Sequence, residues 1–158
     1  YSKLGLGSTF KVYFPRTELA AKAASLSSAP FALRGSETVL LVEDEEQVRK
    51  VASTILRRNG YHVLEAASGS DALLISKGFP GTIHLMLTDV VMPRMSGRQL
   101  AEQLATERPQ TKVMFTSGYT DDAIVRHGVL NSDVAFLQKP FTPDAVLRAV
   151  RDALSGLA

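Results

Sequence analysis

Apolar runs and helical repeats alternate along residues 37–158. Short apolar or alternating runs predict five strands, at 38–43, 61–66, 84–89, 111–117 and 134–138. The first of them, TVLLVE, is apolar almost throughout, which is typical of a strand buried on both faces of a sheet. Apolar residues at helical spacing follow each run and predict five helices, at 44–60, 68–78, 96–108, 120–128 and 142–154.

Residues at the predicted helix ends support these boundaries. Gly60 is suited to close the first helix, and Pro109 stops the third. Thr120 can cap the fourth helix, whose first turn is acidic. Thr142 is the expected N-cap of the last helix, with Pro143 at its first helical position.

Strict alternation of strands and helices predicts the α/β class. Crossover helices give a five-stranded parallel sheet, doubly wound and covered on both faces, with right-handed connections. A strand order of 2-1-3-4-5 has a switch point between the first and third strands. Ligands bind there, outside the carboxyl ends of the strands.

The first 36 residues have a different character. Phe10, Val12 and Phe14 alternate with polar neighbours and predict a strand that ends at Pro15. Its apolar face has no partner in this chain, so we expect it to be disordered or to pair with another molecule. Residues 16–36, rich in Ala and Ser, have linker composition. Tyr at position 1 indicates a piece of a longer protein.

Composition narrows the possible functions. Of 158 residues, 45% are hydrophobic and 22% charged, as in soluble globular proteins, and no apolar run approaches the roughly 20 residues of a membrane helix. The absence of cysteine excludes disulfides and thiolate metal sites. The whole chain has a net charge of +2. Residues 1–36 have a net charge of +4, so residues 37–158 have a net charge of −2. The chain therefore shows no basic face for nucleic acid, and we expect no contact with membranes.

Polar side chains gather where the predicted strands end. These positions are Glu43, Asp44, Asp89, Thr116, Ser117 and Lys139. Each alone has an ordinary explanation: acids favour a helix start, Asp suits a turn, hydroxyls end strands, and Lys is solvated. The carboxyl ends of parallel strands meet at one edge, however, so the side chains should converge.

Convergence of three carboxylates predicts a cation. Their mutual repulsion is relieved by Mg²⁺, which prefers oxygen ligands. A lysine and a hydroxyl beside the metal would complete a cradle for a phosphoryl group. With no general base in the pattern, the simplest chemistry is attack by Asp89 itself, which forms an aspartyl phosphate.

Four segments resemble one family. LLVEDEEQ, LMLTDVVMPRMSG, MFTSGY and FLQKPF, in this order and spacing, are similar to the receiver domain of two-component response regulators. The resemblance covers about residues 37–156 and implies a flavodoxin-like (βα)5 fold. SGY and VVMPRMSG look most like receivers attached to hybrid sensor histidine kinases, which implies bacterial phosphorelay signalling.

The resemblance implies roles for particular residues. Asp89 would accept a phosphoryl group from the phosphohistidine of a histidine kinase or phosphotransfer protein. Glu43, which stands where Asp is commoner, would hold Mg²⁺ together with Asp44, Asp89 and the backbone carbonyl of Val91. The chain would then promote its own phosphorylation and dephosphorylation.

Four further positions follow from the same resemblance. Thr116 and Lys139 would bind phosphoryl oxygens, and the bond before Pro140 would be cis. Thr116 and Phe136 would form the switch that responds to phosphate, although Phe136 also suits an ordinary core position. Residues 120–154 would form the output surface, and whether phosphorylation drives homodimerisation there stays open.

The start of the chain resembles a second family. GLGSTFKVYFPR is similar to the end of a histidine kinase ATPase domain, with a glycine box before the last strand. Residues 1–15 would be a remnant of that domain, 16–36 a linker and 37–156 the receiver. The chain lacks the ATP site and would have no kinase activity. Its partners would include its own kinase core, in the cytoplasm, with a parent kinase that is soluble or membrane-anchored.

Three other readings fit parts of the pattern. A pseudo-receiver would keep the fold and serve only as an interaction module. A Mg²⁺-dependent hydrolase of the haloacid dehalogenase type also uses an Asp at a strand end, but it needs a second acid at position 91, where this chain has Val. A flavin-binding module needs a hydroxyl-rich loop after the first strand, where this chain has acids.

Overall fold

A computed structural model describes residues 33–118 and 135–156, together with residues 2, 3, 5, 7, 8, 11 and 13. The strands of the main sheet span Thr38–Val42 (β3), His62–Ala66 (β4), Leu85–Asp89 (β5), Lys112–Ser117 (β6) and Ala135–Gln138 (β7). The helices span Glu46–Arg58 (α1), Gly69–Gly78 (α2), Gly97–Glu107 (α3) and Pro143–Ser155 (α5). The helix predicted at 120–128 lies outside the described residues.

The five strands are all parallel, in the order β4-β3-β5-β6-β7. Counted from the first strand of the sheet, this is 2-1-3-4-5, and the predicted order and α/β class are confirmed. β3 and β5 lie side by side, with Val42 opposite Thr88. The ends of these two strands therefore meet at the switch point.

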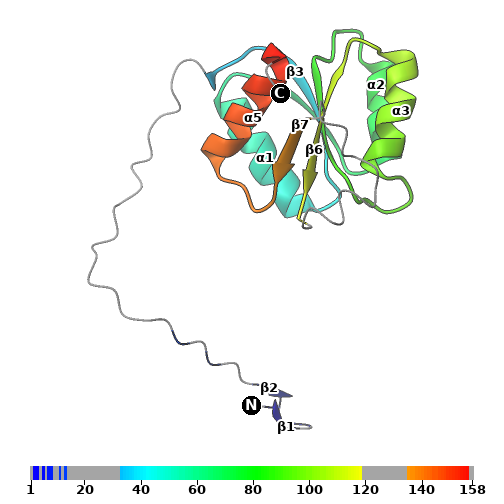
Figure 1. Ribbon diagram of the computed structural model, residues 1–158. Coiled ribbons are helices and arrows are strands. Elements are labelled where there is room, and N and C mark those ends of the chain that lie inside the picture. The colour runs from blue at the N-terminus through cyan, green and yellow to red at the C-terminus, as the bar shows by residue number, and fades with distance from the viewer. Residues whose placement is uncertain are drawn as a thin grey trace.

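Helices cover both faces of the sheet, α1 and α5 on one side and α2 and α3 on the other (Figure 1). Alternate residues of β3 serve the two layers. Val39 and Leu41 pack in the core beneath α1 and α5, whereas Leu40 and Val42 pack beneath α2 and α3. All four are at most 3% exposed, which explains why this strand is apolar without alternation.

The N-termini of α3 and α5 carry hydroxyl caps, and Thr142 caps α5 as the sequence predicted. The Thr142 hydroxyl accepts the backbone N–H of Ala145, and Pro143 occupies the first turn of α5. The N-terminus of α3 carries a full capping box between Ser96 and Gln99. None of the helices in the described ranges is long and apolar enough to cross a membrane.

Near the start of the chain, β1 (Ser2–Lys3) pairs antiparallel with β2 (Gly7–Ser8). The backbone is left-handed at Gly5 and Gly7, which lack the Cβ that would oppose this conformation. Of the strand predicted over residues 10–14, only Lys11 and Tyr13 are described, and neither lies in a strand. The three apolar residues of that prediction lie outside the described part.

The segment that leads into β3 is fixed to the body of the domain. The backbone N–H of Gly35 donates to the carbonyl of Asn59, 3.1 Å away. Arg151 of α5 forms an ion pair with Glu37, and its guanidinium lies 5.7 Å from the centre of the Tyr61 ring. The pair of Arg151 and Glu37 joins residues 114 positions apart in the chain. The segment before β3 is therefore packed against the rest of the domain.

Replacing Glu37 by Gln is expected to lower the free energy of unfolding at neutral pH by about 1 kcal/mol or less. Burial alone would raise the pKa of Glu37, but the hydrogen bond and charge of Arg151, together with backbone hydrogen bonds, outweigh burial and lower it below its ordinary value. A carboxyl group whose pKa is lowered by folding stabilises the protein fully above its unfolded-state pKa. This stability is lost as the pH falls through the folded-state pKa. Urea unfolding at several pH values should therefore show wild type and Glu37→Gln converging in acid. A difference that persists unchanged in acid would contradict this role.

Candidate functional site

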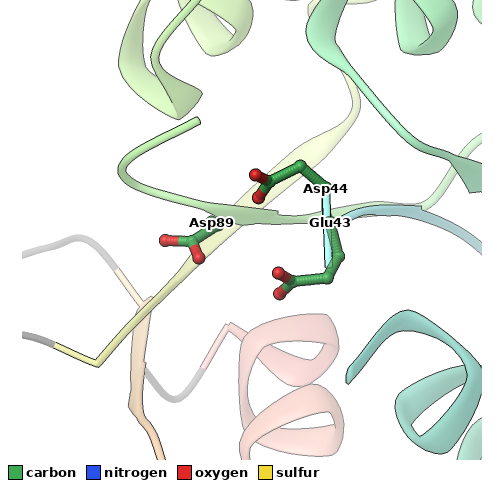
Figure 2. A group of neighbouring side chains, drawn as sticks. All are labelled: Glu43, Asp44 and Asp89. Atoms are coloured by element: carbon green, nitrogen blue, oxygen red, sulfur yellow. The ribbon is translucent and has the colours of Figure 1, made fainter. Parts of the chain in front are cut away.

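Three carboxylates meet at the carboxyl edge of the sheet (Figure 2). Glu43 and Asp44 directly follow β3, and Asp89 is the last residue of the neighbouring β5. One carboxylate oxygen from each lies within 4.8 Å of the other two. The parallel pairing of β3 with β5 produces this arrangement, because it aligns the ends of both strands.

Lys139 lies among these acids. Its ammonium donates to Glu43 Oε2 at 2.6 Å and to Asp89 Oδ2 at 2.7 Å. The Lys139 side chain is 17% exposed, and those of Glu43 and Asp89 are 5% and 15% exposed. The lysine therefore bridges two largely buried carboxylates from two strands.

Burial and charge act on this group in opposite directions. Burial raises the pKa of Glu43, with a contribution from the negative charge of Asp89, and the ion pair with Lys139 offsets it only in part. Burial would lower the pKa of Lys139, but its bonds to Asp89 and Glu43 outweigh burial and raise it. The site thus holds a firmly protonated lysine beside an excess of carboxylate.

Asp89 is held by its neighbours. Its Oδ1 accepts the backbone N–H of Val91 at 3.2 Å, and Val91 itself is 39% exposed. Thr116 pairs with Asp89 across β5 and β6 and is buried. The Thr116 hydroxyl donates to the carbonyl of Thr88 at 3.5 Å, so it lies next to the acids but bonds to backbone.

The remaining predicted residues lie at the end of β6, within β7 and just after β7. Ser117 is buried at the end of β6. Phe136 in β7 is partly buried and packs against a small cluster formed by Val90 and Phe115. The peptide bond between Lys139 and Pro140 is cis.

Gly97 is a residue of the site that sequence reasoning missed. A Cβ at this position would lie 2.2 Å from the carbonyl oxygen of Asp89. The backbone N–H of Gly97 also donates to the carbonyl of Val90 at 3.0 Å. The start of α3 therefore packs directly on the backbone that carries Asp89, and only glycine permits this approach.

Gly97→Ala is expected to cost about 1–3 kcal/mol of stability, because the added methyl must displace backbone rather than a flexible side chain. It should also slow any reaction at Asp89, since the displaced backbone is that of Asp89. Gly78→Ala is the matched control: a Cβ there meets nothing within 4 Å. Thermal unfolding of both variants checks the expectation, which fails if Gly97→Ala is as stable as Gly78→Ala.

A pocket of about 450 Å³ opens beside the bridging lysine. It is lined by Glu45, Gln47, Val48, Val51, Gly118, Lys139, Pro140 and Phe141. α1 supplies apolar side chains to one wall, and Val51 there is 55% exposed. Because Lys139 both lines the pocket and bonds to Asp89, a group seated in the pocket would lie next to the acids.

The donor set of the site suits a hard cation and a phosphoryl group. Carboxylate oxygens are the ligands that Mg²⁺ prefers, and one lysine cannot balance three carboxylates. Ammonium and hydroxyl groups beside a carboxylate nucleophile are the donors that stabilise phosphoryl oxygens. The arrangement is therefore equipped for phosphoryl transfer to a carboxylate.

Comparison with known proteins agrees with this chemistry. Residues 39–151 match the family described as Response regulator receiver domain. The chain is 39% identical over 162 residues to sensor kinase CckA of Brucella abortus (strain 2308), a match that covers 97% of this chain but only 17% of that protein. It is 34% identical to the response regulator receiver protein CpdR of the same organism, covering 65% of this chain and 84% of CpdR.

A solved structure shows the same fold. The crystal structure of the receiver domain from hybrid histidine kinase CckA superposes with a TM-score of 0.62 at 38% identity, covering 74% of this chain and 98% of that domain. The family match spans well over half of the chain, from before the first site acid to beyond Lys139. This chain therefore belongs to the response regulator receiver domain family of two-component signalling proteins.

Proposed function

We propose that Asp89 is the phosphoacceptor of this receiver domain. The observation that carries the proposal is the meeting of Asp89 with two further carboxylates and Lys139 at the switch point of the sheet. A carboxylate oxygen of Asp89 would attack the phosphorus of a phosphohistidine. The P–O bond forms as the P–N bond breaks, and the electron pair returns to the imidazole nitrogen.

The residues of the site fit Mg²⁺ as the cofactor. Glu43, Asp44 and Asp89 would hold it through carboxylate oxygens, with the backbone carbonyl of Val91 as a further ligand. The support is the cluster of three carboxylate oxygens with an excess of negative charge over Lys139. Bound there, the ion would supply neutralising charge for the phosphoryl oxygens.

The groups around Asp89 have distinct roles in this proposal. Lys139 would keep its bond to Glu43 and pair with a phosphoryl oxygen, for which its raised pKa keeps it charged. The Thr116 hydroxyl would leave the Thr88 carbonyl and bond to another phosphoryl oxygen. Phe136, packed near Val90, would respond to that movement as the second part of the switch.

The donor would be the phosphohistidine of a histidine kinase or of a phosphotransfer protein. The pocket beside Lys139 supports this, because its exposed apolar residue Val51 and its neighbour Phe141 suit an apolar helix face. A helix seated there would present its phosphohistidine to Asp89. We propose three further partners: proteins that bind residues 120–154, the chain's own kinase core, and a second copy of the chain.

We further propose that the chain comes from a cytoplasmic part of a hybrid sensor kinase. The match to CckA extends to 97% of this chain and so reaches beyond the receiver residues. Residues 1–15 would then be the last part of a kinase ATPase domain, 16–36 a linker and 37–156 the receiver. Kinase activity would belong to the whole protein, not to these residues.

Incubation with acetyl phosphate tests the proposal. Intact-protein mass spectrometry should show one added phosphoryl group with Mg²⁺ present and almost none after EDTA removes it. An adduct that forms equally well in EDTA would contradict the metal requirement. No adduct with acetyl phosphate or with a phosphorylated histidine kinase would favour a pseudo-receiver that acts only as an interaction module.

A further inference from the structure

The turn between β3 and α1 is stabilised differently from the other helix starts. The N-caps of α2, α3 and α5 are Ser68, Ser96 and Thr142, and each hydroxyl accepts a backbone N–H of its own helix. Within the described part of the chain, no side-chain cap is found at Glu45, the N-cap of α1. This turn carries two of the three acids of the site, so what fixes it matters for function.

Arg49 bonds to this turn in another way, as a donor to its backbone carbonyls. Its Nη1 donates to the backbone carbonyl of Glu43 at 2.6 Å and lies 3.4 Å from that of Asp44. Its backbone N–H donates to the carbonyl of Glu45 at 2.9 Å. One residue of α1 therefore bonds to three consecutive carbonyls of the acid-bearing turn.

Glu43 has other contacts that hold it in place, whereas Asp44 has fewer. Glu43 is also tied by its N–H to Ala66 and by its side chain to Lys139. Asp44 is exposed, and the direction of its carboxylate depends on its backbone. The bond from Arg49 to the Asp44 carbonyl thus bears on the acid with less support from the core.

The helix macrodipole does not explain a cation at this position. The first turn of a helix disfavours positive charge, because its N-terminus carries the positive end of the macrodipole. A cation beside a Mg²⁺ site also repels the ion. The charge of Arg49 does attract the neighbouring acids, Glu46 among them, but any cation would do so. What is particular to Arg49 is geometric, since its planar guanidinium can reach two carbonyls at once.

We propose that Arg49 is a positioning residue, which holds the backbone of Glu43 and Asp44 so that their carboxylates meet Asp89 in the arrangement that binds Mg²⁺. The inference rests on the proposed function. Arg49 touches neither the ion nor the phosphoryl group. It acts through the two carbonyls that precede the helix.

A positioning role and a pure charge effect of Arg49 predict opposite changes in Mg²⁺ affinity. If it acts by position, Arg49→Gln weakens Mg²⁺ binding by about 10-fold or more, the usual effect of removing a group that orients metal ligands. If it acts only as a charge, the same substitution removes a repulsion and tightens binding. Lys50→Gln is the matched control, because Lys50 is the next residue of α1, pairs with Glu46 and is 70% exposed. That control should change the Mg²⁺ affinity by less than about 2-fold, since an exposed charge is well screened.

The experiment is an NMR titration of the full chain with MgCl₂ at constant ionic strength, following backbone amides near Asp44 and Val91. The same spectra show that each variant is folded. Arg49→Gln binding Mg²⁺ at least as tightly as wild type would overturn the inference. Failure of the wild type itself to bind Mg²⁺ would instead overturn the proposed metal site.

A second variant decides the matter if Arg49→Gln does not fold. Arg49→Lys keeps the charge but loses the planar fork, so weaker binding can come only from altered hydrogen bonding. We expect Arg49→Lys to bind Mg²⁺ more weakly than the wild type. Affinity equal to wild type in Arg49→Lys would then count against the positioning role.

Discussion

Asp89→Asn is expected to lower phosphorylation by at least about 10³-fold, because it removes the nucleophile and leaves no second carboxylate in its place. The folded domain should survive. Asn keeps the size of the side chain and relieves repulsion from Glu43 and Asp44, so the free energy of unfolding should stay equal or rise. If the reaction is lost while stability is kept or rises, the loss cannot be due to unfolding of the variant.

The measurement is intact mass after acetyl phosphate and Mg²⁺, with chemical unfolding alongside. Asp71→Asn is the matched control, because Asp71 is an exposed acid in the first turn of α2. It should react as the wild type does. An adduct of wild-type yield in Asp89→Asn would place the acceptor at another residue.

Lys139→Met is expected to slow phosphorylation by about 10²–10³-fold, the usual loss when one donor to a developing negative charge is removed. The ammonium now bonded to Asp89 at 2.7 Å would no longer be there to pair with a phosphoryl oxygen. Mg²⁺ binding should be kept or become tighter, since a neighbouring cation is gone. Stability without Mg²⁺ should fall by up to about 3 kcal/mol, because the buried Glu43 loses its partner.

In Lys139→Met the phosphorylation rate and the free energy of unfolding should therefore fall, while the Mg²⁺ affinity stays the same or rises. Lys112→Met serves as the control, because Lys112 bonds to the carbonyl of Leu154 at an exposed position. Acetyl phosphate kinetics, Mg²⁺ titration and urea unfolding give the three readings. A wild-type phosphorylation rate in Lys139→Met would show that the lysine serves folding alone.

The architecture could be predicted from the sequence because its signals are local and repeated. The uninterrupted apolar run at β3 follows from burial on both faces, with Leu40 and Leu41 in different cores. Ser96 and Thr142 stand where hydroxyl caps are found. The rules for crossover connections limit the possible strand orders, and the order 2-1-3-4-5 is that of the flavodoxin-like fold that the resemblance implied.

The convergence of Glu43, Asp44 and Asp89 could be predicted for the same reason, since parallel strands end at one edge. The partners of Lys139 could not, because the side chain has several rotamers and two acids within reach. The close approach of Gly97 to Asp89 depends on how α3 packs, which no local pattern encodes.

Arginine contacts to distant groups were the least predictable feature. Arg151 reaches Glu37 across most of the chain, and Arg108 donates to the carbonyls of Ser76, Phe79 and Gly81. Arg49 is the fourth residue of α1, near the helix end where the macrodipole disfavours a cation. Such contacts depend on the tertiary structure, so helical periodicity alone predicts a solvated surface charge.

Locating the phosphoryl group tests the central proposal most directly. Borohydride reduces an acyl phosphate to the corresponding alcohol, so the acceptor becomes identifiable by tandem mass spectrometry of the digested protein. After incubation with acetyl phosphate and Mg²⁺, the reduced residue should be at position 89 alone. Reduction at Asp44 or at any other acid, with Asp89 unchanged, would contradict the proposed role of Asp89.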